Sequence, residues 1–454
     1  MQGCGQQEGT GGIRGTTATT ATTGHQRTHD GRVVILAHRP RNRNITIVVT
    51  ARLFMSASRA LAGVVVPVYL AMIGFSALQL GELAVAVGIA TAVLSTAIGL
   101  ASDRVGRKPF LVAVPLLAAL AGVVFAFSRA PALLFLAASV GSFGRGTGAG
   151  AGMVGPYQPA EQALVTEITP PVRRNVAFGR LAFASSVGAL IGGPLALLAG
   201  QGGPGGEAAT AAFRLPFLAT AVLAAAAAGL LALGLREPRR TPSTDGRGPG
   251  LRLPRRSMPL LVRLWATNSV NGLAVGMFGP FVTYWFFRRY GVGPGQIGVL
   301  FAVINAATAA STLTAARFAR RWGLVRTVTM VRVVQAVLLV PMVMAPSFLA
   351  AGAVYLVRMV VQRIGMPLRQ SYVLAMADPG ERAAVGALSN LPSQATMAVA
   401  PLAAGYLFDE VSLSLPFVIA GALQLANAVL YWGFFRGLPP EEEVAARAAT
   451  AAAR

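Results

Sequence analysis

The stretch Gly99-Leu-Ala-Ser-Asp-Arg-Val-Gly-Arg-Lys108 separates two long apolar segments and decides which kind of fold the chain can adopt. Residues 80–100 lead into this stretch and residues 110–128 follow it, and both segments are predominantly apolar. Each is long enough to cross the roughly 30 Å hydrocarbon core of a bilayer as a helix. The stretch is therefore predicted to be a short polar connection between two membrane-spanning helices.

The same alternation of apolar segment and polar connection runs through the chain of 454 residues. Hydrophobic residues make up 54% of it and charged residues 12%, where a soluble domain carries about 25% charged residues. We therefore expect an all-α integral membrane protein with twelve transmembrane helices. The predicted spans are 47–73, 80–100, 110–128, 132–157, 176–200, 213–235, 261–287, 296–316, 326–345, 349–372, 384–408 and 413–435.

A connection rich in Arg, Pro and Gly divides these spans into two sets of six. Residues of the first set recur in the second at an offset of 217 and later 207 positions, for example Gly74 as Gly291 and Pro194 as Pro401. A nearly constant offset is the mark of a parallel duplication, which predicts two pseudo-symmetric six-helix bundles. The expected regions are a disordered cytoplasmic tail with a Thr-rich run (1–44), an N-terminal bundle (45–235), a cytoplasmic linker (236–260), a C-terminal bundle (261–436) and a cytoplasmic C-terminal tail (437–454).

The net charge of +23 could indicate a nucleic-acid-binding protein, so the positions of the arginines matter. With a cytoplasmic N-terminus, connections after even-numbered spans hold about 20 basic residues, and those on the opposite side hold about 4. This bias follows the positive-inside rule. We therefore expect no nucleic-acid partner, and a multi-pass protein of the cytoplasmic (inner) membrane with both termini in the cytoplasm.

Several function classes are excluded by residue types that the predicted membrane region lacks. Cys4 is the only cysteine, and the three histidines all lie in the N-terminal tail. A membrane-embedded enzyme would need clustered His, Asp or Glu, and no nucleotide-binding P-loop motif is present. We expect no metal site, no cofactor and no enzymatic activity.

The connection at 99–108 resembles motif A of the major facilitator superfamily at each of its defining positions: Gly99, Asp103, Arg104, Gly106, Arg107 and Lys108. The resemblance covers about residues 45–436 and implies a drug or metabolite transporter with two six-helix bundles. It also implies that Asp103 helps to latch the two bundles together on the cytoplasmic side. The second copy of the motif has Arg320 where the carboxylate would fall, so Asp103 is the expected gating residue.

Two further segments resemble family motifs less completely. Arg145 precedes a run of glycines in the fourth span, as in motif B, but the usual Gln is missing. Gly188, Gly192, Gly193 and Pro194 in the fifth span resemble motif C, which implies antiport and efflux, although its terminal glycine pair is replaced by leucines. Close packing of helices and a hinge explain the same residues.

Polar groups inside predicted spans are candidates for a substrate site, because a charge within a bilayer is costly. The resemblance implies that spans one, four, seven and ten line a central cavity. An excess of arginine there favours anionic substrates, and the alternative is a structural role for the same side chains. Glu82 and Glu161 are the candidates for proton coupling. The cavity candidates are Arg59, Arg145, Asn268, Asn271, Arg358 and Arg363.

These observations predict a secondary active transporter that moves a small organic solute by alternating access. Gradient-driven efflux of anionic or neutral substrates is favoured. An uptake symporter, a multidrug exporter of the same fold and a non-transporting membrane sensor or scaffold are the alternatives. The expected partners are the small-molecule substrate, the lipid bilayer and, as a candidate coupling ion, the proton, and we expect a monomer.

Overall fold

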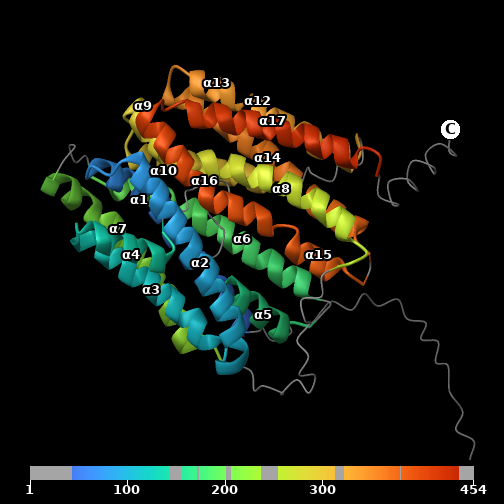
Figure 1. Cartoon of the computed structure of the whole chain (residues 1–454). Coiled ribbons are helices and arrows are strands. Elements are labelled where there is room, and N and C mark those ends of the chain that lie inside the picture. Colours follow the sequence, from blue (N-terminus) through green and yellow to red (C-terminus); the bar gives the residue numbers. More distant parts are fainter. Residues whose placement is uncertain are drawn as a thin grey trace, which may run out of the picture. The chain divides into compact units, whose positions relative to one another are not determined.

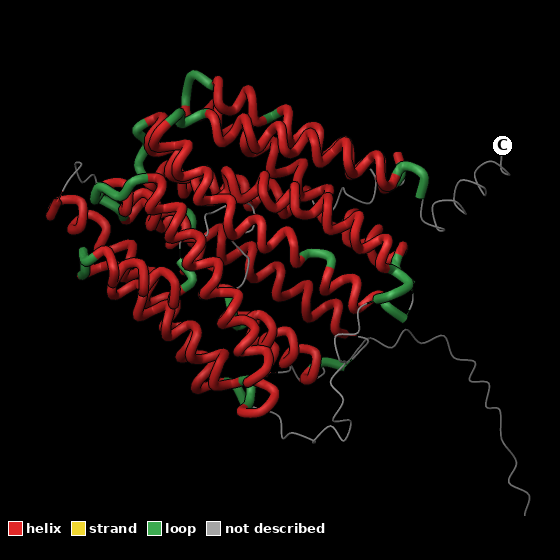
Figure 2. Tube along the Cα trace, in the orientation of Figure 1, coloured by secondary structure: helices red, strands yellow, loops and turns green. Residues whose placement is uncertain are grey.

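The computed structural model describes residues 43–143, 155–170, 173–200, 206–236, 254–311, 322–378 and 380–438. Every regular element within these ranges is a helix (Figure 2). We use the terms N-terminal half for residues 43–236 and C-terminal half for 254–438. The predicted division into two bundles with a linker and two tails stays a prediction.

Five of the first six predicted spans are long helices at about the predicted positions. Of the fourth predicted span (132–157) the structure describes one short helix, Pro131–Gly141, and residues 144–154 lie outside the described ranges. The next short helix, Gln158–Ile168, begins only after the predicted span ends. The bounds are α1 (Arg43–Met72), α2 (Ala77–Val105), α3 (Lys108–Phe127), α4 (Pro131–Gly141), α5 (Gln158–Ile168), α6 (Arg174–Gly192), the 3₁₀ helix η2 (Pro194–Leu198) and α7 (Gly206–Gly234).

The C-terminal half matches the other six predicted spans in the same way. Its bounds are α8 (Met258–Phe278), η3 (Gly279–Phe281), α9 (Val282–Tyr290), α10 (Pro294–Ser311), α12 (Leu324–Val337), α13 (Leu339–Met344), α14 (Phe348–Met376), α15 (Arg382–Leu388), α16 (Leu391–Glu410) and α17 (Leu415–Phe435). Across the described residues, 10 segments are long and apolar enough to cross a membrane, and α4 is a shorter apolar helix. The prediction of an all-α membrane protein is confirmed, and the count of twelve spans is consistent with the structure.

Local sequence signals set the ends of the helices near the polar connections. Ser76 begins α2 with a capping box, in which its hydroxyl accepts from the Gln79 backbone and the Gln79 side chain accepts from the Ser76 backbone. Gly106 ends α2 with φ at 116°, a conformation that a residue with a Cβ adopts only under strain. The chain therefore turns sharply at the connection and enters α3 two residues later.

Each half packs mainly against itself, as Figure 1 shows. In the N-terminal half α1 packs on α6 and α7, and α3 packs on α4 and α7. In the C-terminal half α8 packs on α16 and α17, and α12 packs on α14 and α17. Long helices that run side by side in this way bury the small and apolar residues between them.

The halves meet at one end of the helices, which we call the closed end. There α16 packs along α2, and α10 packs against α6 and η2. The carboxylate of Asp409, at the end of α16, accepts hydrogen bonds from the backbone N–H groups of Ala77 (2.9 Å) and Leu78 (2.8 Å) at the start of α2. A side chain of the C-terminal half thus satisfies two of the free N–H groups that begin a helix of the N-terminal half.

The opposite end, which we call the motif end, carries the connection at 99–108. Two ion pairs between described residues lie there, and each joins residues of the same half. Arg107 pairs with Glu167 in the N-terminal half, and Arg256 pairs with Asp378 at 3.5 Å in the C-terminal half. The described contacts between the halves and these ion pairs therefore lie at opposite ends of the helices.

Candidate functional site

The motif A connection is held to the rest of the N-terminal half by Arg107. Its guanidinium pairs with the carboxylate of Glu167 at the end of α5, and Lys108 begins α3. Gly99 lies in α2, and Gly106 supplies the turn. The side chains of Asp103 and Arg104 lie outside the described part of the structure, as does Arg320 in the second copy of the motif. The predicted latch role of Asp103 stays a prediction.

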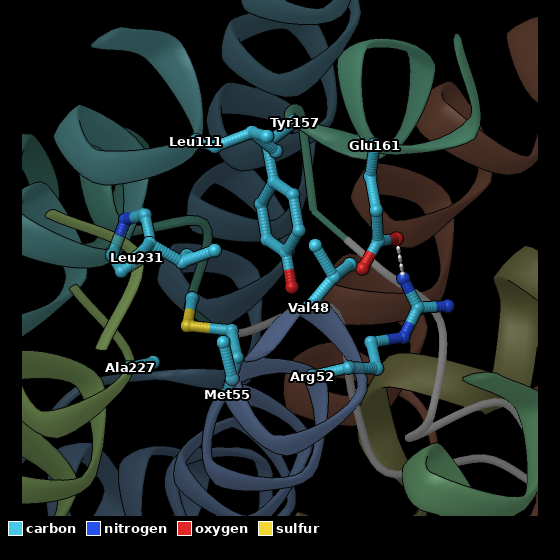
Figure 3. Close-up of a pocket in the computed structure, with 10 residues that line it drawn as sticks. Val48, Arg52, Met55, Leu111, Tyr157, Glu161, Ala227 and Leu231 are labelled. Carbon is cyan, nitrogen blue, oxygen red and sulfur yellow. Dashed lines mark hydrogen bonds and ion pairs between the residues drawn. The ribbon is translucent and has the colours of Figure 1, made fainter. Parts of the chain in front are cut away.

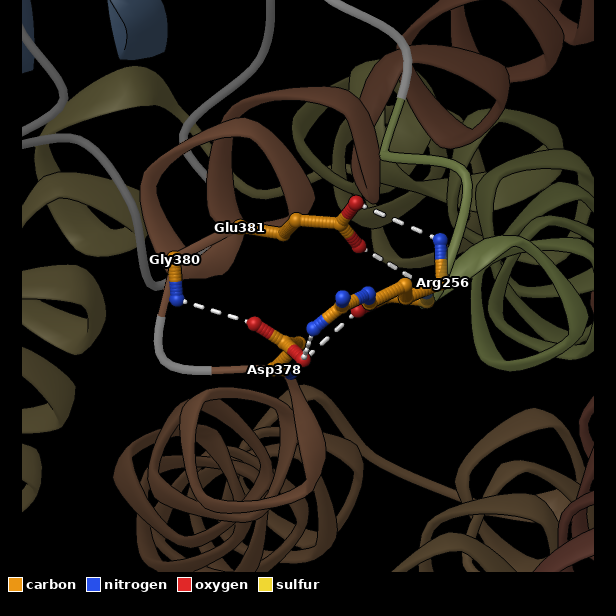
Figure 4. A network of polar contacts seen from close by, with 5 residues as sticks. Arg256, Asp378, Gly380 and Glu381 are labelled. Carbon is orange, nitrogen blue, oxygen red and sulfur yellow. Dashed lines mark hydrogen bonds and ion pairs between the residues drawn. The ribbon is translucent and has the colours of Figure 1, made fainter.

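A polar network at the motif end of the C-terminal half has no counterpart in the sequence predictions (Figure 4). Glu381 accepts hydrogen bonds from the backbone N–H groups of Arg256 (3.2 Å) and Ser257 (2.8 Å), just before α8. Desolvation acts to raise the pKa of Glu381, but the hydrogen bonds from Ser257 and Arg256 outweigh it and lower that pKa below its usual value. This network ties the end of the predicted linker to the turn between α14 and α15.

The interior of the N-terminal half contains a buried ion pair between α1 and α5 (Figure 3). The guanidinium of Arg52 pairs with the carboxylate of Glu161, and its Nε donates to the hydroxyl of Ser185 on α6 at 2.6 Å. The side chains of Arg52 and Glu161 are 10% and 3% exposed. Beside the pair lies a cavity of about 10 Å³, lined also by Tyr157. This volume is near the lower limit for one water molecule.

Arg52 is a functional candidate that the sequence predictions missed. It lies seven residues before Arg59 in the first span, so both project from one side of α1. This spacing could have drawn attention to it. Glu82, the other candidate for proton coupling, is exposed on α2 and belongs to neither the ion pair nor its cavity.

Of the arginines predicted to line the cavity from the first and fourth spans, the structure describes only the first. The guanidinium of Arg59 packs directly against the backbone of Gly155, where a side chain would collide with it. Arg145 lies outside the described residues. Their predicted role in substrate binding stays a prediction.

Asn268 lies in a buried cluster at the junction of α8, α14 and α16. Its amide donates to the carbonyl of Ser389 at 2.6 Å, and its oxygen accepts from the guanidinium of Arg369. The second terminal nitrogen of Arg369 donates to the side-chain oxygen of Asn390 at 3.0 Å. Arg369 lies within α14, two turns before the helix ends, and it was not among the predicted site residues.

Further polar side chains continue this cluster along the C-terminal half. Asn271, one turn after Asn268, accepts from the amides of Gln424 and Asn427 on α17, both at 3.5 Å. Arg358 is fully buried, donates from Nε to the carbonyl of Gln335 at 3.3 Å and lies 4.2 Å from the ring centroid of Phe278. It therefore packs inside the C-terminal half.

Two further arginines lie in the C-terminal half, one a predicted cavity residue and one that was not predicted. Arg363 is half-buried on α14. Arg332 on α12 is 6% exposed and lies 5.0 Å from the ring centroid of Tyr431 on α17. No polar residue of this span was among the predicted site residues, although Arg332 interrupts an apolar run and was therefore detectable.

The glycines that resemble motif C lie at close helix contacts. Gly188 and Gly192 face the backbone of α1, so that a Cβ on either would collide with a main-chain oxygen. Gly193 faces the carbonyl of Gly298 on α10 of the other half, and Pro194 begins η2. Small residues here allow α6 to pack closely against α1 of its own half and the start of η2 to pack closely against α10 of the other half.

Relatives with known names share this architecture. A curated multidrug resistance protein of Bacillus subtilis (strain 168) is 23% identical over 384 residues, which cover 84% of this chain and 93% of that protein. Among solved structures, a bacterial homologue of the human lysosomal transporter Spinster, in an inward-facing and unoccupied conformation, matches with a TM-score of 0.66 at 15% identity, covering 90% of this chain and 98% of that one. The nucleoside transporter NupG matches with a TM-score of 0.67 at 13% identity, covering 86% of this chain and 99% of that one.

The solved relatives are transporters rather than enzymes, and their identities are low enough that the likeness establishes the fold alone. The family model described as "Major Facilitator Superfamily" matches residues 48–267 and 264–453. These matches cover both halves of the chain, in agreement with the motif at 99–108. The chain belongs to the major facilitator superfamily.

Proposed function

We propose that this protein is a secondary transporter that moves a small organic solute across the cytoplasmic membrane by alternating access. The observation that carries the proposal is the arrangement of contacts between the halves. Asp409 and the close packing of Gly193 on Gly298 join the halves at the closed end. At the motif end, the pairs Arg107–Glu167 and Arg256–Asp378 lie within the halves.

The motif end carries the excess of arginine, so we assign it to the cytoplasm by the positive-inside rule. The structure would then correspond to the state that opens inward. Opening to the other side requires the contacts of Asp409 with Ala77 and Leu78 to break. Alternating access of this kind is a movement of one bundle against the other.

Efflux of anionic or neutral solutes is the direction and substrate class that we propose. Arginines rather than carboxylates dominate the interior polar groups, and the partial motif C at Gly192 favours export. The multidrug resistance protein of Bacillus subtilis gives some support to export by its name. A solved relative named as a D-xylose–proton symporter supports the alternative of uptake.

Transport in proteoliposomes tests the proposal. The full chain is reconstituted, a pH gradient of either sign is imposed, and fluxes of anionic, neutral and cationic organic solutes are compared. We expect gradient-dependent flux of at least one anionic or neutral solute in the outward direction. Flux that is purely inward would overturn efflux, and no flux of any class in a folded protein would favour the sensor or scaffold.

Hydrogen exchange tests the assignment of the closed end. In Asp409→Ala the amides of Ala77 and Leu78 lose their acceptor, and we expect them to exchange about 10-fold faster, since about 1–2 kcal/mol of contact energy is lost. Glu410→Ala is the matched control, because Glu410 is its exposed neighbour and neither amide donates to it. Equal exchange in the two variants would contradict the role of Asp409 in closing this end.

A further inference from the structure

The C-terminal half carries positive charge in its interior that its own carboxylates do not balance. Between residues 254 and 438 the sequence has four acidic residues, and they are Asp378, Glu381, Asp409 and Glu410. The first two lie in the network at the motif end, and the last two lie at the end of α16. The carboxylates of this half therefore lie at the two ends of its helices.

One buried guanidinium lies over a phenol, and a second lies on a neighbouring helix. Arg332 on α12 lies over the ring of Tyr431 at 5.0 Å. On α14, Tyr372 lies one turn after Arg369, and its ring centroid lies 6.3 Å from that of Tyr431. Because α12 packs on both α14 and α17, Arg332, Arg369 and Tyr431 come from three neighbouring helices.

Two polar atoms of this cluster have no hydrogen-bond partner among the described residues. They are Nη1 of Arg332 and the hydroxyl of Tyr431, and both are buried. Arg332 is 6% exposed and Tyr431 is fully buried. A buried guanidinium nitrogen without an acceptor is costly, so an unsatisfied donor of this kind calls for an ion or water that completes it.

Among the described residues, the side chains beside Arg332 and Arg369 carry no negative charge. Arg369 donates to the amide oxygens of Asn268 and Asn390, which fix the direction of its guanidinium but carry no charge. The rings beside Tyr431 belong to Tyr372 and Phe435, with centroids at 6.3 Å and 4.7 Å. A positive charge in an apolar interior is costly unless an anion lies nearby.

We propose that Arg332, Arg369 and Tyr431 form a binding site for a carboxylate inside the C-terminal half. The planar fork of a guanidinium matches the two oxygens of a carboxylate, and the phenol hydroxyl can donate a third hydrogen bond. The site lies among α12, α14 and α17 of one half, apart from the residues that join the halves. Arg369 also binds Asn268, one of the predicted cavity residues, but the proposal concerns binding of an anion and is tested without transport.

The carboxylate has two possible sources, which are a free small anion and the chain itself. The hydroxyl of Tyr372 donates to the carbonyl of Leu438 at 3.0 Å, and the ring of Tyr372 neighbours that of Tyr431. Glu441, Glu442 and Glu443 follow three residues later in the sequence, outside the described ranges. The experiment must separate these two sources.

The test compares the melting temperature of the purified full chain in sodium acetate and in sodium chloride at equal ionic strength. If a free carboxylate binds, we expect acetate to raise the Tm of the wild type by about 3 °C relative to chloride. Arg332→Gln should abolish this difference, and Tyr431→Phe, which keeps the ring, should weaken acetate binding about 3- to 10-fold. Arg358→Gln is the matched control, since Arg358 is also buried against an aromatic ring, and it should keep the difference.

The triple variant Glu441→Gln, Glu442→Gln, Glu443→Gln tests the internal source. If these carboxylates occupy the site, the triple variant lowers the Tm in the wild-type background but not in Arg332→Gln, and it makes the protein responsive to acetate. Either pattern supports the proposal and identifies the source. The proposal is overturned if acetate and the triple variant both act independently of Arg332, or if Arg358→Gln loses the acetate response as well.

Discussion

The two halves of the molecule contain buried guanidinium groups and treat them differently. In the N-terminal half, Arg52 pairs with the carboxylate of Glu161 and with the hydroxyl of Ser185. In the C-terminal half, Arg358 and Arg369 are bound by carbonyl and amide oxygens, and Arg332 lies over an aromatic ring. Both halves bury polar side chains, but Arg52 of the N-terminal half has a carboxylate partner, whereas the described interior of the C-terminal half contains no carboxylate.

This difference teaches that structural duplication does not preserve electrostatics. An ion pair such as Arg52–Glu161 is electrically neutral, so the N-terminal interior can be stable with no ligand. Arg332 and Arg369 bring a net positive charge into an apolar region, and that charge favours any anion that can reach it. Variants that remove a counter-ion or a buried charge from one half test this comparison directly.

The largest effect is expected from removing the carboxylate of the N-terminal half. Glu161→Ala leaves the charge of Arg52 buried without its counter-ion, and this should cost about 3–5 kcal/mol of stability. Glu167→Ala is the matched control on the same helix, because its pair with Arg107 is partly exposed (39% for Glu167), and it should cost less than about 1 kcal/mol. Denaturant unfolding in detergent measures both, and equal losses would contradict the importance of burial.

An intermediate effect is expected from the amide that orients Arg369. Asn268→Ala removes the acceptor of one guanidinium nitrogen and the donor to Ser389, and it should cost about 2 kcal/mol. Arg358→Met, in contrast, replaces a buried charge with an apolar chain of similar length and should be neutral or stabilising by about 1 kcal/mol. The same unfolding measurement ranks the two variants. A reversed order would mean that Arg358 has a counter-charge in the folded protein.

The smallest effect concerns the network at the motif end of the C-terminal half. Because the pKa of Glu381 is lowered in the folded state, its contribution to stability is fully present above about pH 4.5 and is lost as the pH falls through the lower folded value. Glu381→Gln should therefore lower the Tm slightly at pH 7 and make no difference at pH 3. Melting curves of the wild type and the variant across this range measure the effect. A difference in Tm between the wild type and the variant that increases toward pH 3 would contradict the lowered pKa of Glu381.

Much of the fold was predictable from the sequence, because a helix that spans a bilayer needs about 20 consecutive, mostly apolar residues. The apolar segments on either side of Gly99 and Lys108 are helices in the structure, and Gly106 marks the turn between α2 and α3. The family assignment made from the residues of this connection is confirmed by the family match across both halves. Helices that depend on the average hydrophobicity of a segment, and turns that depend on one glycine, could therefore be predicted well.

The candidate site was less predictable, because its contacts join residues that are far apart in the chain. Arg52 and Glu161 are 109 positions apart, and nothing in either segment indicates that they pair. Arg369 falls within the tenth predicted span, but nothing near it in the sequence indicates that Asn268, 101 positions away, accepts a hydrogen bond from its guanidinium. A sequence gives the identity of an intramembrane charge, but its partner depends on how the helices rotate and pack.

The contact of Asp409 with α2 has a consequence for the order in which the protein is made. Asp409 follows Ala77 by 332 positions. At about 5–20 residues per second, it leaves the ribosome roughly 20–70 s after the start of α2. During that interval Ser76 and Gln79 provide the capping of α2 from within the same segment. The start of α2 is thus first capped by residues of its own segment. The hydrogen bonds to Asp409 are added only after α16, one of the last helices, has been made.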